Sequence, residues 1–176
     1  MKIKGTKFII KLTEKEDLEN IQMLWNNGEV MKWVGLPSGC NITIDKLENW
    51  FKGVQKSKDN KHFVVIHEEL GFCGEVYYGM KPEYKRAGLD IKFLPGSQGK
   101  GLATEALQLL INYIFENEKE IDSVWTEPSI ANNSARKLYQ MCGLKSAKRP
   151  KDMEPEESYW ELNREEWETK NKPCIK

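Results

Sequence analysis

The segment with the clearest chemical potential is a glycine-rich turn between a strand pattern and a helical pattern. It reads Gln98-Gly-Lys-Gly-Leu-Ala-Thr104 and follows an alternating apolar stretch at 87–93. The first backbone N–H groups of a helix lack intrahelical acceptors, and the helix dipole is positive at that end. Because Gly99 and Gly101 leave the backbone uncovered and Lys100 adds a cation, this turn can bind a diphosphate.

Two other phosphate-binding patterns fit this turn poorly. A nucleoside triphosphate loop has Ser or Thr directly after Gly-Lys, but Gly101 follows Lys100 here. A dinucleotide fingerprint would use Gly99 and Gly101 with Glu127 as its ribose acid, yet Thr104 stands where the third glycine belongs. That fingerprint also opens its domain, whereas this turn lies beyond the middle of the chain. A nucleotide-dependent oxidoreductase is therefore a remote alternative.

A third pattern accounts for more residues. Residues 98–103 resemble the Gln/Arg-x-x-Gly-x-Gly/Ala signature by which the GNAT (general N-acetyltransferase) family holds the coenzyme A pyrophosphate. Further along, Asn132-Asn-Ser-Ala-Arg-Lys-Leu-Tyr139-Gln-Met-Cys-Gly-Leu144 resembles the family's second signature, Asn-x-x-Ala-Arg-x-x-Tyr-x-x-x-Gly-Phe. Leu144 replaces the final aromatic residue. The resemblance extends from the first strand to about Asn163.

Two branches of the family share shorter segments with this chain. Gly88-Leu-Asp90 and Thr126-Glu-Pro128 resemble the Gly-Ile-Asp and Thr-Asp-Pro segments of aminoglycoside 6′-N-acetyltransferases. Residues 99–106 equally resemble the ribosomal-protein and N-terminal-alanine acetyltransferases. The resemblance implies acetyl transfer from acetyl-CoA, as cosubstrate, to a primary amine.

Such a reaction needs a proton acceptor, because alkylamines are mostly protonated at neutral pH. Asp90 is the first candidate, since it lies mid-strand, where aspartate is disfavoured, and matches the carboxylate of Gly-Ile-Asp. Glu127 ends the adjacent predicted strand and could hold the cationic acceptor or share the role of base. For both, a solvated strand residue is the alternative interpretation. Glu75 ranks third, because no motif supports it.

The second signature supplies the expected acid. Tyr139 lies about two helical turns after Asn132, which leaves both on one helix face. The resemblance implies that the Tyr139 hydroxyl protonates the leaving sulfur, although a half-buried structural tyrosine is the alternative. It also implies that the backbone N–H near Phe93 or Leu94, at a splayed strand end, polarises the thioester carbonyl. The expected cofactor contacts are Phe93, Leu94, Gln98, Gly99, Lys100, Gly101, Leu102, Ala103, Thr104, Asn132, Ala135 and Tyr139.

Hydrophobic periodicity predicts the elements that position these residues. Strands are expected at 8–12, 63–66, 72–78, 87–93 and 124–126 and near Leu144 and Tyr159, and helices after a capping box at 13–16, after Thr43, at 99–117 and at 133–141. The pattern predicts a mixed α/β fold with a mostly antiparallel central sheet and helices on both faces. The resemblance adds a parallel, splayed pair of strands.

Composition limits the partners and the compartment. Lys and Arg number 27, as do Asp and Glu, so no net field favours nucleic acid or a membrane surface. The four cysteines and two histidines show no metal-ligand spacing, so no metal is expected. The start of the chain carries no secretion signal, which predicts a cytoplasmic protein with reduced thiols. We expect one N-acetyltransferase domain at 1–163, followed by a charged tail at 164–176.

The preferred function is acetyl transfer to a small-molecule amine, aminoglycoside-like or polyamine-like, by direct attack in a ternary complex. An acidic loop at 152–157 would suit a cationic acceptor. Trp25, Trp33, Trp50 and Trp160 could line an acceptor pocket, but we expect them in the core. One alternative is an acetyltransferase of protein N-termini or ribosomal proteins. A second is a non-catalytic sensor of acyl-CoA. A homodimer is one option for assembly.

Overall fold

The computed structural model describes residues 1–154 and 156–171, and the alternating apolar segments of the sequence form a single eight-stranded sheet. Its strands, in spatial order, are β1 (Lys2–Lys4), β2 (Phe8–Leu12), β3 (Asn60–His67), β4 (Gly71–Lys81), β5 (Arg86–Phe93), β6 (Ser123–Thr126), β8 (Trp160–Asn163) and β7 (Lys145–Ser146). All neighbours are antiparallel except β5 and β6, which are parallel. The predicted mixed α/β class is confirmed.

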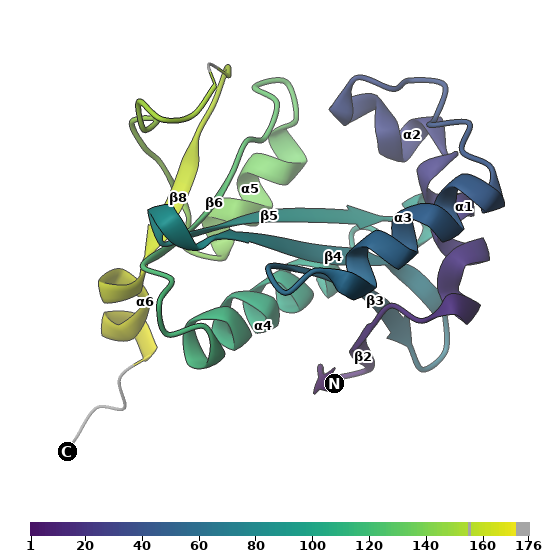
Figure 1. The fold of residues 1–176 in the computed structure, drawn as a ribbon, viewed down its shortest axis with the longest axis horizontal. Coiled ribbons are helices and arrows are strands. Elements are labelled where there is room, and N and C mark those ends of the chain that lie inside the picture. The colour runs from purple at the N-terminus through teal and green to yellow at the C-terminus, as the bar shows by residue number, and fades with distance from the viewer. Residues whose placement is uncertain (155, 172–176) are drawn as a thin grey trace.

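Helices cover the sheet on both faces, as Figure 1 shows. They are α1 (Leu18–Trp25), α2 (Gly28–Met31), α3 (Ile44–Lys56), α4 (Leu102–Asn117), α5 (Asn133–Met141) and α6 (Arg164–Asn171). In Figure 1, α4 runs beneath the sheet, while α1 to α3 gather at the end opposite α6. One buried cluster joins α4 and α5 to the sheet, and a smaller one joins α1 and α3 to β3.

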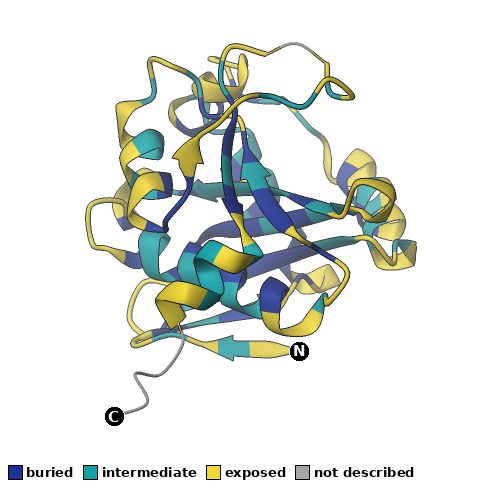
Figure 2. Cartoon of the chain, turned by 90° about the vertical axis from the view of Figure 1, so that its left-hand side faces the viewer, coloured by how far each residue is buried: buried dark blue, intermediate teal, exposed yellow. Residues whose placement is uncertain are grey.

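The central strands divide their residues between these faces, because neighbouring side chains of a strand point in opposite directions. Buried residues such as Phe63, Val76 and Leu89 pack with α4 in the larger core, dark blue in Figure 2. The opposite face carries polar side chains in cross-strand register: Tyr77 pairs with Asp90. This polar set faces α1 and α3 and lines a cavity described below.

The parallel pair separates soon after it begins. Only Arg86, Ala87 and Gly88 of β5 pair with β6, while β5 continues to Phe93. A Cβ on Gly88 would lie 3.0 Å from the Trp125 ring, so glycine allows the close approach of the two strands. Beyond that point the strands splay, as the resemblance implied.

Two predicted boundaries are corrected. The capping box uses Glu14 and Asp17, one residue later than predicted, and precedes a short 3-10 turn before α1. Helix α4 begins at Leu102 and not at Gly99, because Gly99 and Gly101 adopt left-handed φ values of 73° and 77°. The glycines therefore form a turn ahead of the helix.

The segment 164–171 is a helix, although the sequence indicated only a charged tail with one anchor. Trp167 packs on Phe115 with ring centroids 5.2 Å apart, and its Nε1 donates to Asn112 Oδ1 at 2.8 Å. Arg164 donates to carbonyl oxygens at the end of α4, including Phe115 O at 2.6 Å. Residues 172–176, with Cys174, lie outside the described residues.

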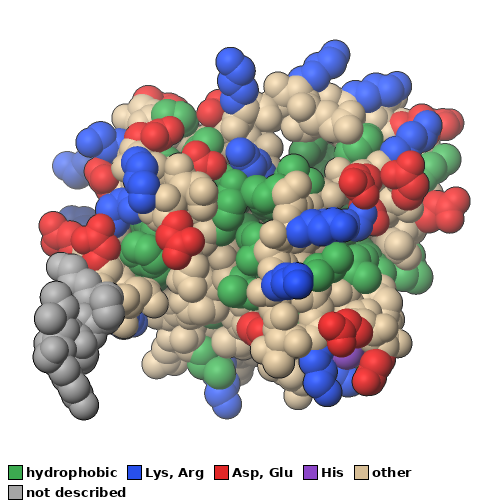
Figure 3. All heavy atoms as spheres, turned by 90° about the horizontal axis from the view of Figure 1, so that it is seen from below, with side chains coloured by type: hydrophobic (Ala, Val, Ile, Leu, Met, Phe, Trp, Pro, Cys, Tyr) green, Lys and Arg blue, Asp and Glu red, His purple; other side chains and the backbone are tan. Residues whose placement is uncertain are grey.

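The surface carries both signs of charge. Seen from below α4, acidic and basic side chains are interspersed with hydrophobic ones (Figure 3). Within residues 1–154 and 156–171, no helix is both long and apolar enough to cross a bilayer.

Candidate active site

The glycine-rich turn leaves open space in front of α4. A Cβ built on Gly99 or Gly101 would meet no protein atom within 4 Å. Helix α4 has 16 residues, so its amino-terminal N–H groups and dipole face that space. Lys100 lies at the turn and donates to Gly96 O at 2.9 Å. These features fit an anionic diphosphate, whose oxygens would approach backbone unobstructed by side chains.

The end of β5 offers one of the two predicted backbone donors. The Leu94 N–H already donates to Cys73 O of β4 at 2.8 Å, so it is not available for a thioester carbonyl. Backbone N–H groups of successive residues in a strand point to opposite sides. The Phe93 N–H therefore points away from β4, toward the side where β5 and β6 splay apart. Gln98 Nε2 donates to Phe93 O at 2.9 Å and fixes the turn on this strand end.

Helix α5 brings the predicted acid toward β5. Asn132 caps the helix by accepting from the Ala135 N–H at 3.0 Å. Tyr139, on the same helix, is buried, and this burial raises its pKa to about 12. Tyr139 belongs to the same buried cluster as Leu89 and Phe93 of β5. At neutral pH the phenol therefore carries a proton that it can donate.

A cavity of about 700 Å³ opens on the polar face of the central strands. Its lining combines aromatic rings with three charged groups, and comes from α1, α2, α3, β3, β4 and β5. The aromatic and charged members are Trp25, Trp50, His62, Tyr77, Glu75, Asp90 and Lys92. Trp25 and Trp50 form an edge-to-face pair with centroids 4.8 Å apart. Aromatic faces and carboxylates together suit an organic cation.

Asp90 is the accessible carboxylate of this cavity. Its side chain is 46% exposed, and Lys92 Nζ donates to its Oδ2. The Ile91 N–H donates to Oδ1 at 2.8 Å. Each oxygen retains a further lone pair, so a protonated amine or a water molecule can still be bound.

Glu75 lies deeper and is enclosed by donors. Trp25 Nε1 lies 2.8 Å from Oε2 and 2.9 Å from Oε1, His62 Nε2 lies 3.1 Å from Oε2, and Lys92 Nζ lies 3.1 Å from Oε1. Burial opposes its charge, but the hydrogen bond from His62 and the charge of Lys92 outweigh it and lower the Glu75 pKa to about 2. Glu75 is therefore an anion that organises the cavity.

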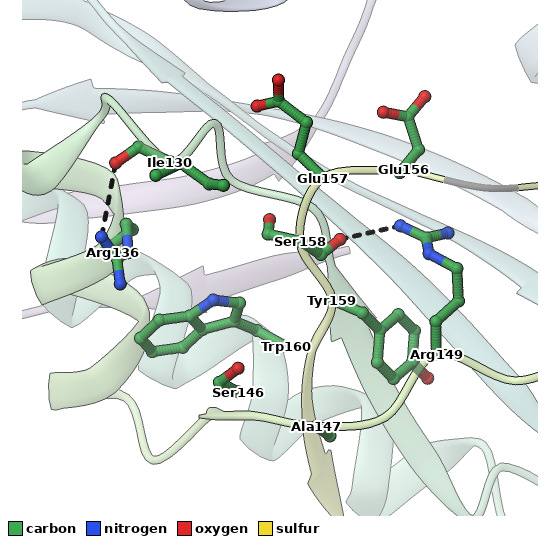
Figure 4. Close-up of a pocket in the computed structure, with 10 residues that line it drawn as sticks. All are labelled: Ile130, Arg136, Ser146, Ala147, Arg149, Glu156, Glu157, Ser158, Tyr159 and Trp160. Carbon is green, nitrogen blue, oxygen red and sulfur yellow. Dashed lines mark hydrogen bonds between the residues drawn. The ribbon is translucent and has the colours of Figure 1, made fainter.

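Glu127 is not brought into this cavity. Its carboxylate accepts from Arg149 Nη1, and Arg149 also donates to Ser158 O at 2.7 Å. Arg149, Glu156 and Glu157 line a separate hollow of about 330 Å³ (Figure 4). Glu156 and Glu157 of the acidic loop thus lie at this second hollow, and no described residue of 152–157 lines the Asp90 cavity.

Sequence reasoning missed several cavity residues. It assigned Trp25 and Trp50 to the core, and it gave no role to His62 or Lys92. One signal was present, because His62, Glu75 and Lys92 lie among strand residues of alternating polarity. Their meeting depends on strand register, which no local motif contains.

Comparisons with known proteins agree with this geometry. The profile of the acetyltransferase (GNAT) domain matches residues 7–145. The aminoglycoside N(6′)-acetyltransferase type 1 of Klebsiella pneumoniae is 22% identical over 146 residues, which cover 77% of this chain and 72% of that relative.

Two solved structures share the fold. Spermidine N-acetyltransferase from Vibrio cholerae, in complex with CoA and spermine, superposes with a TM-score of 0.80 at 19% identity, covering 93% of this chain and 99% of that one. The ribosomal-protein α-N-acetyltransferase RimL, in complex with coenzyme A, gives 0.75 at 11% identity, covering 94% and 99%. A dodecameric form of the Vibrio cholerae enzyme is similar too, with a TM-score of 0.76 at 18% identity, covering 95% and 99%.

The family profile spans most of the chain and includes the glycine-rich turn and the second signature up to Lys145. The chain therefore belongs to the GNAT family of acetyltransferases and is an acetyl-CoA-dependent N-acetyltransferase.

Proposed function

We propose that the protein acetylates a primary amine of a small cationic molecule, polyamine-like or aminoglycoside-like, bound in the cavity that Asp90 lines. The observation that carries the proposal is the lining itself, in which Trp25, Trp50 and Tyr77 surround carboxylates. A volume of about 700 Å³ also lies in the range typical of small-molecule sites.

The free carboxylate of the cavity favours a cation. Lys92 pairs with the buried Glu75, and the more exposed Asp90 carboxylate lies in the same lining as the aromatic rings. Relatives that act on aminoglycosides and spermidine take amines of this kind. A protein N-terminus would need a cleft for extended peptide, whereas the combination of Trp25, Trp50 and Asp90 in one lining suits a small cationic acceptor.

The proposed reaction is direct attack in a ternary complex. Asp90, directly or through water, accepts a proton from the ammonium group, and the neutral amine nitrogen then attacks the thioester carbonyl carbon. The Phe93 N–H stabilises the developing oxyanion. The C–S bond breaks, and Tyr139 donates its proton to the leaving sulfur. The nitrogen loses its second proton and Tyr139 is reprotonated from solvent, so the net reaction releases one proton.

The proposed cosubstrate contacts lie at the turn and on α5. The backbone N–H groups of 99–104 would hold the pyrophosphate, with Lys100 adding charge. Asn132 uses its Oδ1 to cap α5, so only its amide N–H donors would remain for the pantetheine arm. Ala135 lies beside it on the first turn of the helix.

The acceptor class is tested by thiol release from acetyl-CoA with polyamines, aminoglycosides, amino acids and short peptides. We expect turnover with the polyamines or aminoglycosides, and a roughly tenfold rise in acceptor KM for Trp50→Ala, because a cation–π contact is lost. Trp33→Ala is the matched control, since Trp33 is exposed and does not line the cavity. Turnover only with peptides, or an equal effect of both variants, would contradict the proposal.

Self-association is a separate proposal. The dodecameric relative of similar fold supports an oligomer of this chain, for which a homodimer is the simplest unit. Light scattering after size exclusion tests it, and a 20.5 kDa species at all concentrations would contradict it.

A further inference from the structure

Lys92 occupies an unusual place for a lysine. It lies on β5 between two carboxylates, with its side chain only 12% exposed, and donates to Glu75 Oε1 at 3.1 Å and to Asp90 Oδ2. Burial disfavours the ammonium, but the charges of Asp90 and Glu75 outweigh that effect and raise the Lys92 pKa. Lys92 is therefore a fixed cation inside the acceptor cavity.

Glu75 in turn holds Lys92 in place. Lys92 and Glu75 are cross-strand partners, and the other donors to Glu75 come from α1 and β3, through Trp25 and His62. An ionised carboxylate only accepts, so His62 Nε2 donates to it, while His62 Nδ1 lies 2.7 Å from Thr13 Oγ1. This chain of contacts runs from the end of β2 to Asp90 and leaves Lys92 little freedom.

We propose that Lys92 is a positioning residue that holds the Asp90 carboxylate, in its charged form, at the entrance of the acceptor cavity. The inference rests on the proposed role of Asp90 as the proton acceptor. With Glu75 neutralising Lys92, the charge of Asp90 is left for the acceptor, and the Lys92 and Ile91 contacts fix its two oxygens. The ammonium group of the substrate then meets a carboxylate of defined orientation.

Other titratable groups line the same cavity. They are Glu75 and Tyr77 on β4, His62 on β3 and Cys40 ahead of α3. Lys92 is the lysine among the described residues of the cavity lining, and its ammonium group contacts Asp90. Its removal should therefore release the Asp90 carboxylate from its present orientation.

The test is steady-state kinetics of the full chain on the preferred amine, with Lys92→Met beside the parent, together with crystal structures of both proteins that show the orientation of the Asp90 carboxylate. We expect that carboxylate to lose its fixed orientation in Lys92→Met, because the Nζ contact to Oδ2 is lost. We expect kcat to fall about tenfold from misorientation, with the KM for acetyl-CoA within about twofold of the parent. Lys92→Arg, which keeps the cation, should recover most of the kcat and of the Asp90 orientation.

Controls separate this inference from folding and from the proposed function. Lys145→Met removes an exposed lysine paired with Glu166 and should match the parent. Where Lys92→Met unfolds because Glu75 loses its counter-ion, the double variant with Glu75→Gln removes both charges and carries the same expected loss of Asp90 orientation and of kcat. An unmoved Asp90 carboxylate, or a displaced one with parental kcat, would overturn the positioning role. Parental activity of Asp90→Asn would instead refute Asp90 as base, and the orientation of Asp90 in Lys92→Met would still judge Lys92.

Discussion

At the scale of single residues, the proposed cosubstrate site depends on glycines, whose lack of a side chain leaves room in front of α4. Gly101 has a φ of 77° and faces open space, so under the proposed cosubstrate binding a methyl group there would meet the pyrophosphate and no protein atom. We predict that Gly101→Ala raises the KM for acetyl-CoA roughly tenfold, because the phosphate is held away from the helix N–H groups. Steady-state kinetics with varied acetyl-CoA measures this effect.

Gly71→Ala is the matched control, because Gly71 has a φ of 68° in equally open space on the β3–β4 turn. It carries the same backbone strain without lying near the cosubstrate. A similar rise in KM for both variants would show that strain, and not pyrophosphate contact, causes the effect.

Residue identity and spacing are sufficient to propose the cosubstrate side of the site. The turn at 98–104 and the motif from Asn132 to Tyr139 are local, and each keeps its chemistry within one strand–turn–helix unit. The acceptor side is not predictable in this way, because Trp25, His62 and Lys92 meet only through register and helix packing. The Leu94 N–H was a predicted donor to the thioester carbonyl, but it already donates to Cys73 O of β4. That strand pairing cannot be read from the sequence.

At the scale of elements, α6 packs against α4 and caps its C-terminal end. The Arg164 guanidinium donates to the carbonyl oxygens of Phe115, Glu118 and Ile121, which end α4 and its connection. We predict that Arg164→Ala lowers the free energy of unfolding by about 2 kcal/mol, since charge-assisted hydrogen bonds to exposed helix carbonyls are lost. Urea unfolding followed by circular dichroism measures the change.

Glu165→Ala, at the exposed neighbouring position, should change that free energy by less than about 1 kcal/mol. Equal losses in the two variants would contradict the capping role. Periodicity missed α6 because only Trp167 in 164–171 carries a large apolar group, whereas α4 was visible from its repeated buried residues.

At the scale of the whole molecule, the buried anion of Glu75 both stabilises the fold and lines the proposed acceptor cavity. Glu75 has a folded pKa of about 2 against an ordinary value of 4.5, so its contribution is complete above pH 4.5 and is lost as pH falls toward 2. A shift of that size corresponds to about 3 kcal/mol. We predict that the parent loses more unfolding free energy between pH 5 and about pH 2 than Glu75→Gln does, as urea titrations at each pH measure.

Parallel pH profiles for the two proteins would contradict this coupling. The mostly antiparallel sheet with helices on both faces followed from periodicity, but the placement of Glu75 did not, because a glutamate on a strand is ordinarily solvated. Only the packing of α1 and α3 over the strands turns it into a buried anion.

The measurement that tests the central claim most directly is the kcat for acetylation of the preferred amine by Asp90→Asn, with Asp122→Asn as the exposed control. The account predicts a loss of about a hundredfold in kcat for Asp90→Asn, with unchanged acetyl-CoA affinity by calorimetry and parental activity of the control. Parental kcat for Asp90→Asn would contradict the claim that this cavity performs the proton transfer.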